Sequence, residues 1–386
     1  MKFLFKSTLL FTTFLLFFPI FINAQDQPVD VNQLGGRVNI ISTAVPFLNI
    51  APDSRSGAMG EAGVATAPDF SSQHWNPAKY AFLDEDYGIS VSFTPWLRQL
   101  VSDINMYYLS GFYRIDKMST LSGSVRYFSL GNIFITDNGT NGYDAKPNEF
   151  ALDAAYSRLL SKKMSGSVAF RYIRSDLGGG MVEGMIPGNT FAADVSFFYK
   201  TPIKTGSQKS EIATGVNISN IGAKISYDGD NKQFIPTNLK VGAAYTTEID
   251  KYNKLTFALD FNKLLVPTPG LLDSTQISYA QENKDVGVIT GMFKSFGDAP
   301  NGFKEELQEI SISVGMEYWY NQQFALRAGY FHENENKGNR KFITAGAGLK
   351  MNMFTVDASY IIPMVQNNPL ANTIRISLSF NLSDAL

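Results

Sequence analysis

Few residues of this chain have side chains suited to acid–base or nucleophilic catalysis. The sequence contains two histidines, His74 and His332, and a serine-type hydrolase would need one of them beside a serine and a carboxylate. The predicted strands put these histidines near opposite ends of the fold, so they cannot form one site. The sequence also lacks a His-Glu-x-x-His motif, a nucleophile elbow and a Walker loop. We therefore expect no catalytic residues and no enzymatic activity.

Metal and cofactor ligands are equally scarce. The run Asp228-Gly229-Asp230-Asn231 gathers side-chain oxygens of the kind that calcium prefers, but the rest of an EF-hand loop is missing, and we interpret the run as a polar loop tip. The tract from Gly57 to Gly63 follows no strand of a βαβ unit, so it is not a phosphate cradle. With zero cysteines the chain has no thiolate metal site, disulfide or lipidated cysteine. We expect no cofactor and no metal.

The N-terminus has the pattern of a secretory signal. Lys2 and Lys6 precede an apolar run from Leu9 to Ile22, and the small residue Ala24 suits the position before a signal-peptidase cut. We predict a signal peptide over residues 1–24. The full sequence carries a formal net charge of -2 with scattered Lys and Arg, so it has no basic stripe for nucleic acid.

Apolar and polar residues alternate in many later segments, which is the period of a β-strand with one apolar face. We predict that Leu326, Val356 and Ile376 face lipid, and that their charged neighbours Arg327, Asp357 and Arg375 face a lumen. Charges of both signs recur on the polar faces, where a soluble sandwich would show Lys, Thr and Glu. We interpret them as a structural network of ion pairs, with a polar conduit or ligand site as the alternative. They are Arg126, Asp153, Arg171, Asp194, Asp260, Arg327, Asp357 and Arg375.

From Gly88 onward about fourteen such segments can be counted, an even number as bacterial outer-membrane barrels require. Short and long connections alternate between them, and short turns belong on the periplasmic side. We predict an all-β fold, a transmembrane β-barrel of about 14 antiparallel strands over residues 88–386. Its location would be the outer membrane of a Gram-negative cell.

A segment rich in small residues separates the signal from the first strand. It holds the glycine and alanine tract and then the turn Trp75, Asn76, Pro77 and Ala78. This order resembles the FadL-like outer-membrane barrels, in which a small-residue segment and an Asn-Pro-Ala turn lead into the first strand and fill the lumen. The resemblance implies that residues 25–87 form an N-terminal plug or cap.

The runs Ile41 to Leu48 and Ala51 to Arg55 are similar to the PorV family, FadL-like barrels of the Bacteroidetes type IX secretion system. This resemblance implies a non-enzymatic component that binds the C-terminal signal domains of cargo leaving the translocon barrel, called SprA or Sov. It would deliver them to the sortase PorU, where many are joined to lipopolysaccharide. The implied partners are therefore SprA/Sov, cargo C-terminal domains, PorU, and outer-membrane lipid and lipopolysaccharide. The alternative is a FadL-type transporter of fatty acids or other hydrophobic compounds.

The longest predicted connection, residues 263–308, is apolar in places where an exposed loop would be polar. Exposed apolar residues often mark a partner surface, so we predict partner-binding anchors in this loop; burial against the barrel rim is the equally open alternative. We also expect a helical turn over Phe303 to Leu307. The predicted anchors are Leu264, Leu265, Val266, Leu271 and Leu272.

Overall fold

The computed structural model describes residues 39–98, 101, 103–137, 141–178, 182, 184–206, 208–269, 285–364 and 370–383. The predicted signal peptide, residues 1–24, and the first part of the predicted plug, residues 25–38, lie outside this range. None of the helices in the described ranges is both long enough and apolar enough to cross a membrane.

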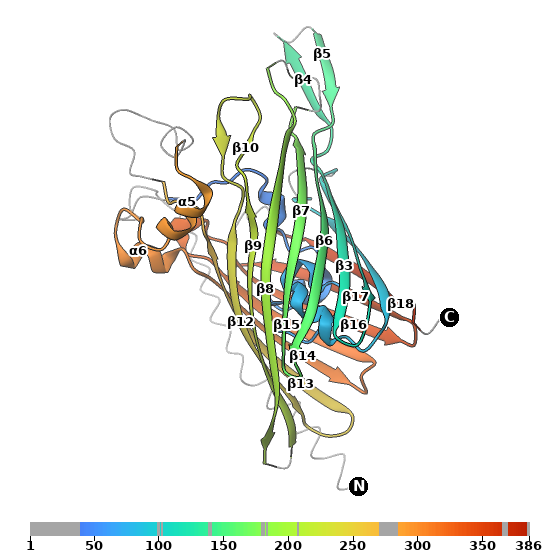
Figure 1. Ribbon diagram of the computed structural model, residues 1–386. Coiled ribbons are helices and arrows are strands. Elements are labelled where there is room, and N and C mark those ends of the chain that lie inside the picture. Colours follow the sequence, from blue (N-terminus) through green and yellow to red (C-terminus); the bar gives the residue numbers. More distant parts are fainter. Residues whose placement is uncertain are drawn as a thin grey trace. The chain divides into compact units, whose positions relative to one another are not determined.

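In the described part of the chain fourteen strands, each antiparallel to its neighbours, close into a barrel (Figure 1). The strands follow one another round the ring in chain order, and the pairing of β1 with β18 closes it. An all-β antiparallel barrel of the predicted size is therefore confirmed. The strands are β1 Tyr87–Pro95, β2 Asn105–Arg114, β3 Ser119–Ser129, β6 Asn148–Ser161, β7 Met164–Asp176, β8 Gly188–Thr205, β9 Gln208–Gly222, β12 Asn238–Glu248, β13 Asn253–Leu264, β14 Ser311–Tyr320, β15 Phe324–His332, β16 Lys341–Met351, β17 Phe354–Pro363 and β18 Ile374–Asn381.

Two small hairpins interrupt long connections that the sequence predicted as loops. They are β4 Ile133–Asp137 with β5 Asn141–Ala145, and β10 Ile225–Ser226 with β11 Lys232–Gln233. Strands of two to five residues contain too few alternating positions to show a period.

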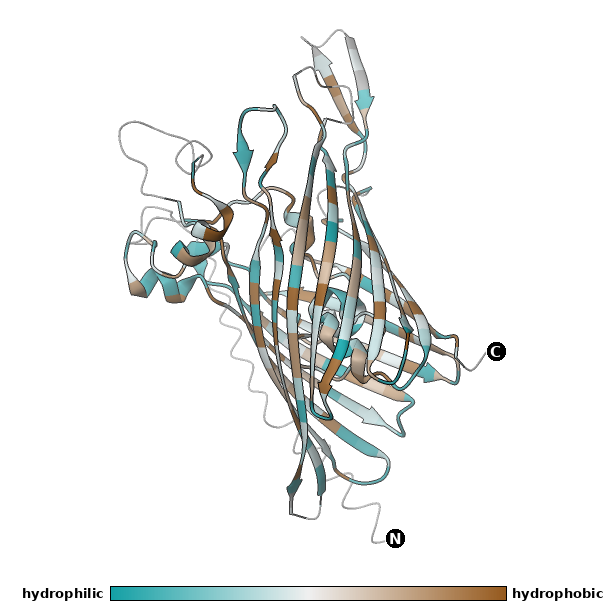
Figure 2. Ribbon diagram, viewed as in Figure 1, coloured by the Kyte–Doolittle hydropathy of each residue, from teal (hydrophilic) through white to brown (hydrophobic). Residues whose placement is uncertain are grey.

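Side-chain burial alternates along the barrel strands as predicted. Leu326, Val356 and Ile376 are 48%, 36% and 49% exposed on the outer face, whereas Arg327, Asp357 and Arg375 are 4%, 6% and 0% exposed on the inner face. The same alternation is visible in the colouring of the strands (Figure 2). The outer face is thus the apolar belt that lipid requires, and the inner face carries the charges.

Strand β2 is the informative exception, because its sequence alternates poorly while its burial alternates well. Its inward residues Met106, Tyr108 and Phe112 are apolar or aromatic and buried. They pack against residues of the N-terminal segment, Phe112 against Tyr80 with ring centroids 5.5 Å apart. A filled lumen accepts apolar side chains on its inner face.

The described part of the segment before β1 lies inside the ring and contains four short helices, and three further short helices lie on the described parts of connections between strands. Short turns join the strands at one end of the barrel, as at residues 162–163 and 352–353, and the long connections lie at the other end. The short-turn end is therefore periplasmic and the long-loop end extracellular. The helices are η1 Pro46–Asn49, α2 Ser54–Ala58, α3 Ser72–Trp75, η2 Pro77–Phe82, α5 Val288–Lys294, α6 Phe303–Gln308 and η3 Glu335–Lys337.

Candidate partner-binding site

The turn Trp75, Asn76, Pro77 and Ala78 joins α3 to η2 inside the barrel. Asn76 caps η2, because its Oδ1 accepts a hydrogen bond from the Ala78 N–H at 3.1 Å. Pro77 occupies the first helical position, where its missing N–H costs nothing. Trp75 ends α3 and donates its Nε1 hydrogen to Asp53 at 2.6 Å. The residue types of this turn are therefore explained by local geometry.

Side chains and backbone atoms of the wall hold the same turn in place. Ser157 and Ser165 donate to the carbonyl oxygens of Pro77 and Ala78 at 2.8 and 2.6 Å. Asn217 donates to the Trp75 carbonyl at 3.0 Å, and Asn76 donates to the Phe197 carbonyl at 3.0 Å. Four neighbouring strands, β6 to β9, thus fix one turn. Whether residues 25–87 act as a plug that closes the lumen stays a prediction.

Small residues allow the inner segment and the opposite wall to touch. Gly60 has a φ of 66°, and a Cβ there would lie 2.6 Å from backbone atoms of Tyr330. A Cβ on Gly329 would lie 2.0 Å from the Gly60 nitrogen. The glycine tract therefore serves close packing, as the sequence predicted.

The predicted inward charges form ion pairs across the wall and to the inner segment. Arg327 contacts Glu317 at 2.7 Å and Asp357 at 2.6 Å, and Arg55 of α2 contacts the other oxygen of Glu317 at 2.8 Å. A second group joins Arg171 to Asp153 and Asp194, and Arg375 contacts Glu61 at 2.8 Å. Asp260 accepts from the backbone N–H groups of Gly63 and Val64. Six of the eight predicted charges therefore form ion pairs, as the network interpretation expects. Asp260 instead accepts backbone hydrogen bonds, and Arg126 donates to the carbonyl oxygens of Phe47 and Leu48.

The two histidines have separate surroundings. The His74 Nδ1 lies 2.7 Å from the Arg126 guanidinium, and its ring meets Trp75 edge-on. The His332 Nδ1 lies 3.1 Å from the Tyr330 hydroxyl. In the described ranges no three His, Asp or Glu residues are placed to hold a metal ion.

Asp228 uses its oxygens to build the turn between β10 and β11. Its carboxylate accepts from the backbone N–H groups of Asn231 at 2.7 Å and Asp230 at 2.9 Å, and from the Ser226 hydroxyl at 3.0 Å. These hydrogen bonds, led by that from Asn231, hold the pKa of Asp228 below its ordinary value. Asp228 to Asn231 thus form a polar loop tip, as the sequence predicted.

Part of the predicted set of exposed partner-binding anchors in the connection between β13 and β14 is wrong. Leu264 ends β13 and is partly buried, while Leu265 and Val266 are 4% and 0% exposed, so neither is an exposed anchor. Leu271 and Leu272 lie outside the described residues. The predicted helical turn is confirmed as α6, and α5 had no clear signal in the sequence.

Buried ion pairs clamp α6 to the rim of the barrel. Lys263 of β13 contacts Glu306 at 3.0 Å and Glu309 at 2.6 Å. Lys337 of η3 contacts Glu305 at 2.6 Å and Glu309 at 3.0 Å. All five of these charged residues are less than one tenth exposed, so the helix is held in one position by contacts that water does not loosen.

Glu305 is charged in this clamp. Burial opposes its ionised form, but hydrogen bonds from Lys337, Asn301 and Asn39 outweigh burial and hold the pKa of Glu305 below its ordinary value. Asn39 donates to Glu305 at 3.0 Å, so the start of the described chain is joined to α6 as well.

Five apolar side chains of this helical connection are exposed. Phe293 and Phe303 are each 76% exposed, Ile289 is 56%, and Phe296 and Leu307 are 53%. Figure 1 shows α5 and α6 beside the barrel at the end where the long connections lie. A rigid, exposed apolar face of this kind is unusual unless a partner or a membrane covers it. We call the face formed by these five residues the aromatic face.

A closed antiparallel ring with an apolar outer belt and a charged inner face defines an outer-membrane β-barrel protein. Comparison with known protein families gives a match over residues 33–271 to the family described as type IX secretion system protein PorV. The match covers more than half of the sequence, so the chain belongs to the PorV family and is an outer-membrane component of a type IX secretion system.

Among solved structures, the chain resembles the toluene transporter TodX of Pseudomonas putida at 11% identity and a TM-score of 0.48, over 89% of this chain and 99% of TodX. It resembles a FadL homologue of Pseudomonas aeruginosa at 11% identity and a TM-score of 0.42, over 89% and 99%. No curated protein matches the chain.

Proposed function

We propose that this chain is a non-enzymatic carrier that receives the C-terminal signal domains of secreted cargo as they leave the SprA/Sov translocon. It then delivers them to the PorU sortase, where cargo is joined to lipopolysaccharide. Membership of the PorV family supports this role. The structural observation that supports the proposed role is the aromatic face, which lies at the extracellular end of the barrel beside the ion pairs that hold α6.

The clamp suits such a surface for energetic reasons. Binding energy at protein interfaces is concentrated in a few buried anchors, often aromatic. Each side chain or loop that must be ordered on binding reduces the affinity, so a loop already fixed to the barrel loses less. Phe293 and Phe303, the most exposed members of the face, are therefore the expected anchors.

The test replaces both anchors, Phe293→Ser with Phe303→Ser, and compares that variant with Lys294→Ser and Lys304→Ser. The lysines follow the anchors directly in the chain and are also exposed, so the control changes the same helices without touching the aromatic face. We expect the phenylalanine variant to fold in the outer membrane but to lose co-purification of the translocon barrel or of cargo C-terminal domains. Secreted proteins should then accumulate in the periplasm.

Unchanged co-purification and secretion in the phenylalanine variant would refute the assignment of this face. Normal secretion combined with lost uptake of long-chain fatty acids would favour the alternative, a FadL-type transporter of hydrophobic compounds.

A further inference from the structure

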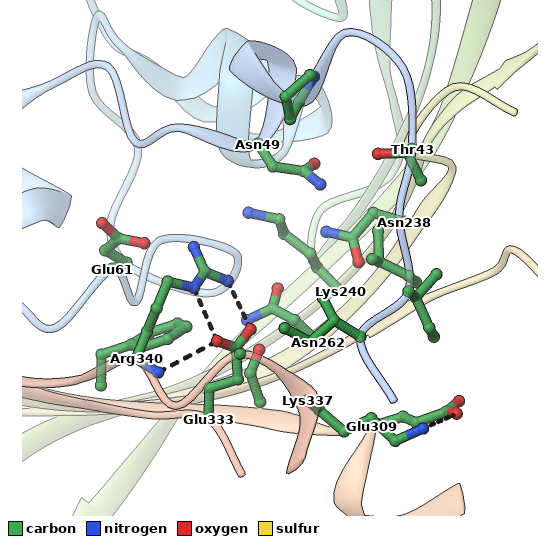
Figure 3. Close-up of a pocket in the computed structure, with 17 residues that line it drawn as sticks. Thr43, Asn49, Glu61, Asn238, Lys240, Asn262, Glu309, Glu333, Lys337 and Arg340 are labelled. Carbon is green, nitrogen blue, oxygen red and sulfur yellow. Dashed lines mark hydrogen bonds and ion pairs between the residues drawn. The ribbon is translucent and has the colours of Figure 1, made fainter. Parts of the chain in front are cut away.

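A cavity of about 280 Å³ lies inside the extracellular end of the barrel, between residues 40–49, the strands β12 to β14 and the connection from β15 to β16 (Figure 3). At about 30 Å³ for each water molecule it has room for roughly nine. Its lining is mixed, with Leu264 and Phe331 beside amides and charged groups. The aromatic face does not contribute to it.

Lys240 supplies the charge that distinguishes this cavity. Its side chain is 8% exposed, extends into the space between Asn49 and Arg340, and has its ammonium 4.5 Å from the centre of the Trp75 ring (Figure 3). Within the described ranges the Lys240 ammonium makes no hydrogen bond or ion pair, and the contact that it does make is with the Trp75 ring.

The other cations of the lining have carboxylate partners. Arg340 contacts Glu333 at 2.8 Å, and Lys337 contacts Glu309 at 3.0 Å. Taking an ammonium out of water without an anion close to it is costly, and a ring face offsets a small part of that cost. Ionisable side chains at membrane depth that have no structural partner mark functional sites. Glu61 and Asp260 attract the Lys240 ammonium from beyond ion-pair distance, so the position of a direct anionic partner is open to a ligand.

Carboxamides surround the ammonium. Asn262 is the direct cross-strand partner of Lys240, and Asn238 lies two residues before Lys240 on the same face of β12. Asn49 approaches from the inner segment (Figure 3). The Asn262 Oδ1 is buried and has no hydrogen-bond partner. Because each amide offers both a donor and an acceptor, a ligand that satisfies this site must itself carry donors as well as an anion.

We propose that this cavity binds a small hydroxylated carboxylate, of the size and chemistry of a monosaccharide acid. Its carboxylate lies against the Lys240 ammonium, and its hydroxyl groups exchange hydrogen bonds with Asn238 and Asn262. Inorganic phosphate fits less well, because its dianion HPO4²⁻ offers a single hydroxyl hydrogen to the three carboxamides of the lining, whereas a sugar acid offers several. A fatty acid fits less well, because its chain would lie among amides and carboxylates. The proposal is independent of cargo delivery.

The test uses the purified full chain in detergent micelles and D-glucuronate as the probe, with binding measured by isothermal titration calorimetry. We expect saturable binding that Lys240→Met weakens about tenfold or more, since hydrogen bonds to charged groups are the strong ones. Lys209→Met is the matched control, because Lys209 is an exposed lysine near the short-turn end. Its affinity should equal that of the unmodified chain.

A second variant keeps the test decisive if Lys240→Met does not fold. Asn262→Leu should weaken D-glucuronate about fivefold or more while leaving binding of acetate, which has no hydroxyl groups, unchanged. Absence of glucuronate binding by the unmodified chain would overturn the proposal. Equal affinity in every variant would also overturn it, and so would laurate or inorganic phosphate binding more tightly than glucuronate through Lys240.

Discussion

Replacing Leu109 by arginine should destabilise the barrel far more than the same replacement at Tyr113. Both residues are in β2 and both project outward, with exposed fractions of 43% and 59%. Leu109 pairs with Val91 on one side and Val125 on the other, and both are exposed and apolar. Leu109 therefore occupies the middle of the lipid-facing belt, whereas Tyr113 lies next to a short turn.

The expected difference follows from the depth of the two positions. Four residues at about 3.4 Å each correspond to about 14 Å along the strand, and a tilt of about 40° converts this to roughly 10 Å of depth. The apolar band is about 25 Å tall, so this step leads from its middle almost to its edge. Arginine costs about 2–4 kcal/mol at the midplane and about 0–1 kcal/mol near the interface. We expect the two variants to differ by about 2 kcal/mol or more.

The free energy of unfolding can be measured by urea titration of the barrel folded into phospholipid vesicles, followed by tryptophan fluorescence and extrapolated linearly. Leu109→Ala controls for the loss of the leucine side chain without adding a charge. Equal destabilisation by arginine at both positions would refute the placement of the apolar belt at the middle of β2.

Three further predictions concern the inner segment and the clamp. Gly60→Ala should lower the unfolding free energy by about 1–2 kcal/mol or more, because Gly60 has a left-handed backbone and the new Cβ would clash with Tyr330. Gly229→Ala is the control for the backbone contribution alone, since Gly229 has a φ of 86° and no atom lies within 4 Å of its Cβ position. Equal destabilisation by the two variants would contradict the close approach of Gly60 to Tyr330. Asn76→Ala should cost about 0.5–2 kcal/mol for the lost cap, and an unchanged urea midpoint would contradict this. Ionised Glu305 should stabilise the clamp at neutral pH, and this stabilisation should be lost as the pH falls below 4.5 and through the lowered pKa of Glu305. Protease cleavage within residues 287–302 should then become faster as the pH falls. In the variant Glu305→Gln the cleavage rate should not change with pH in this way.

The strands could be predicted because a membrane barrel imposes a strict two-residue period. Leu326 and Arg327 are consecutive in one strand and must face opposite sides of the barrel wall. The apolar residue indicates the lipid-facing side and the charged residue the lumen. The turn at Asn76 could be recognised for a similar reason, since a cap followed by proline has a local signature.

What the sequence could not show depends on contacts between distant residues. Leu265 and Val266 are apolar residues in a predicted loop, and their burial becomes visible in the folded chain alone. Lys240 faces inward like the paired charges, so its lack of a direct ion pair is visible in three dimensions and not in the sequence pattern. The exposed aromatic face on α5 and α6 likewise becomes apparent once the clamp orients those helices.

The seam between β1 and β18 sets the order in which this protein can assemble. Ser54 of the inner segment donates its backbone N–H to Ser377 of β18 at 2.8 Å, across 323 residues of chain. The inner segment therefore rests against the last of the described barrel strands in chain order, and contacts of such sequence separation make folding slow. Because Ser54 contacts β18 directly, closure of the seam and packing of the inner segment are coupled. Until β18 arrives, β1 is an unpaired edge, and the cell has to shield that edge from other chains.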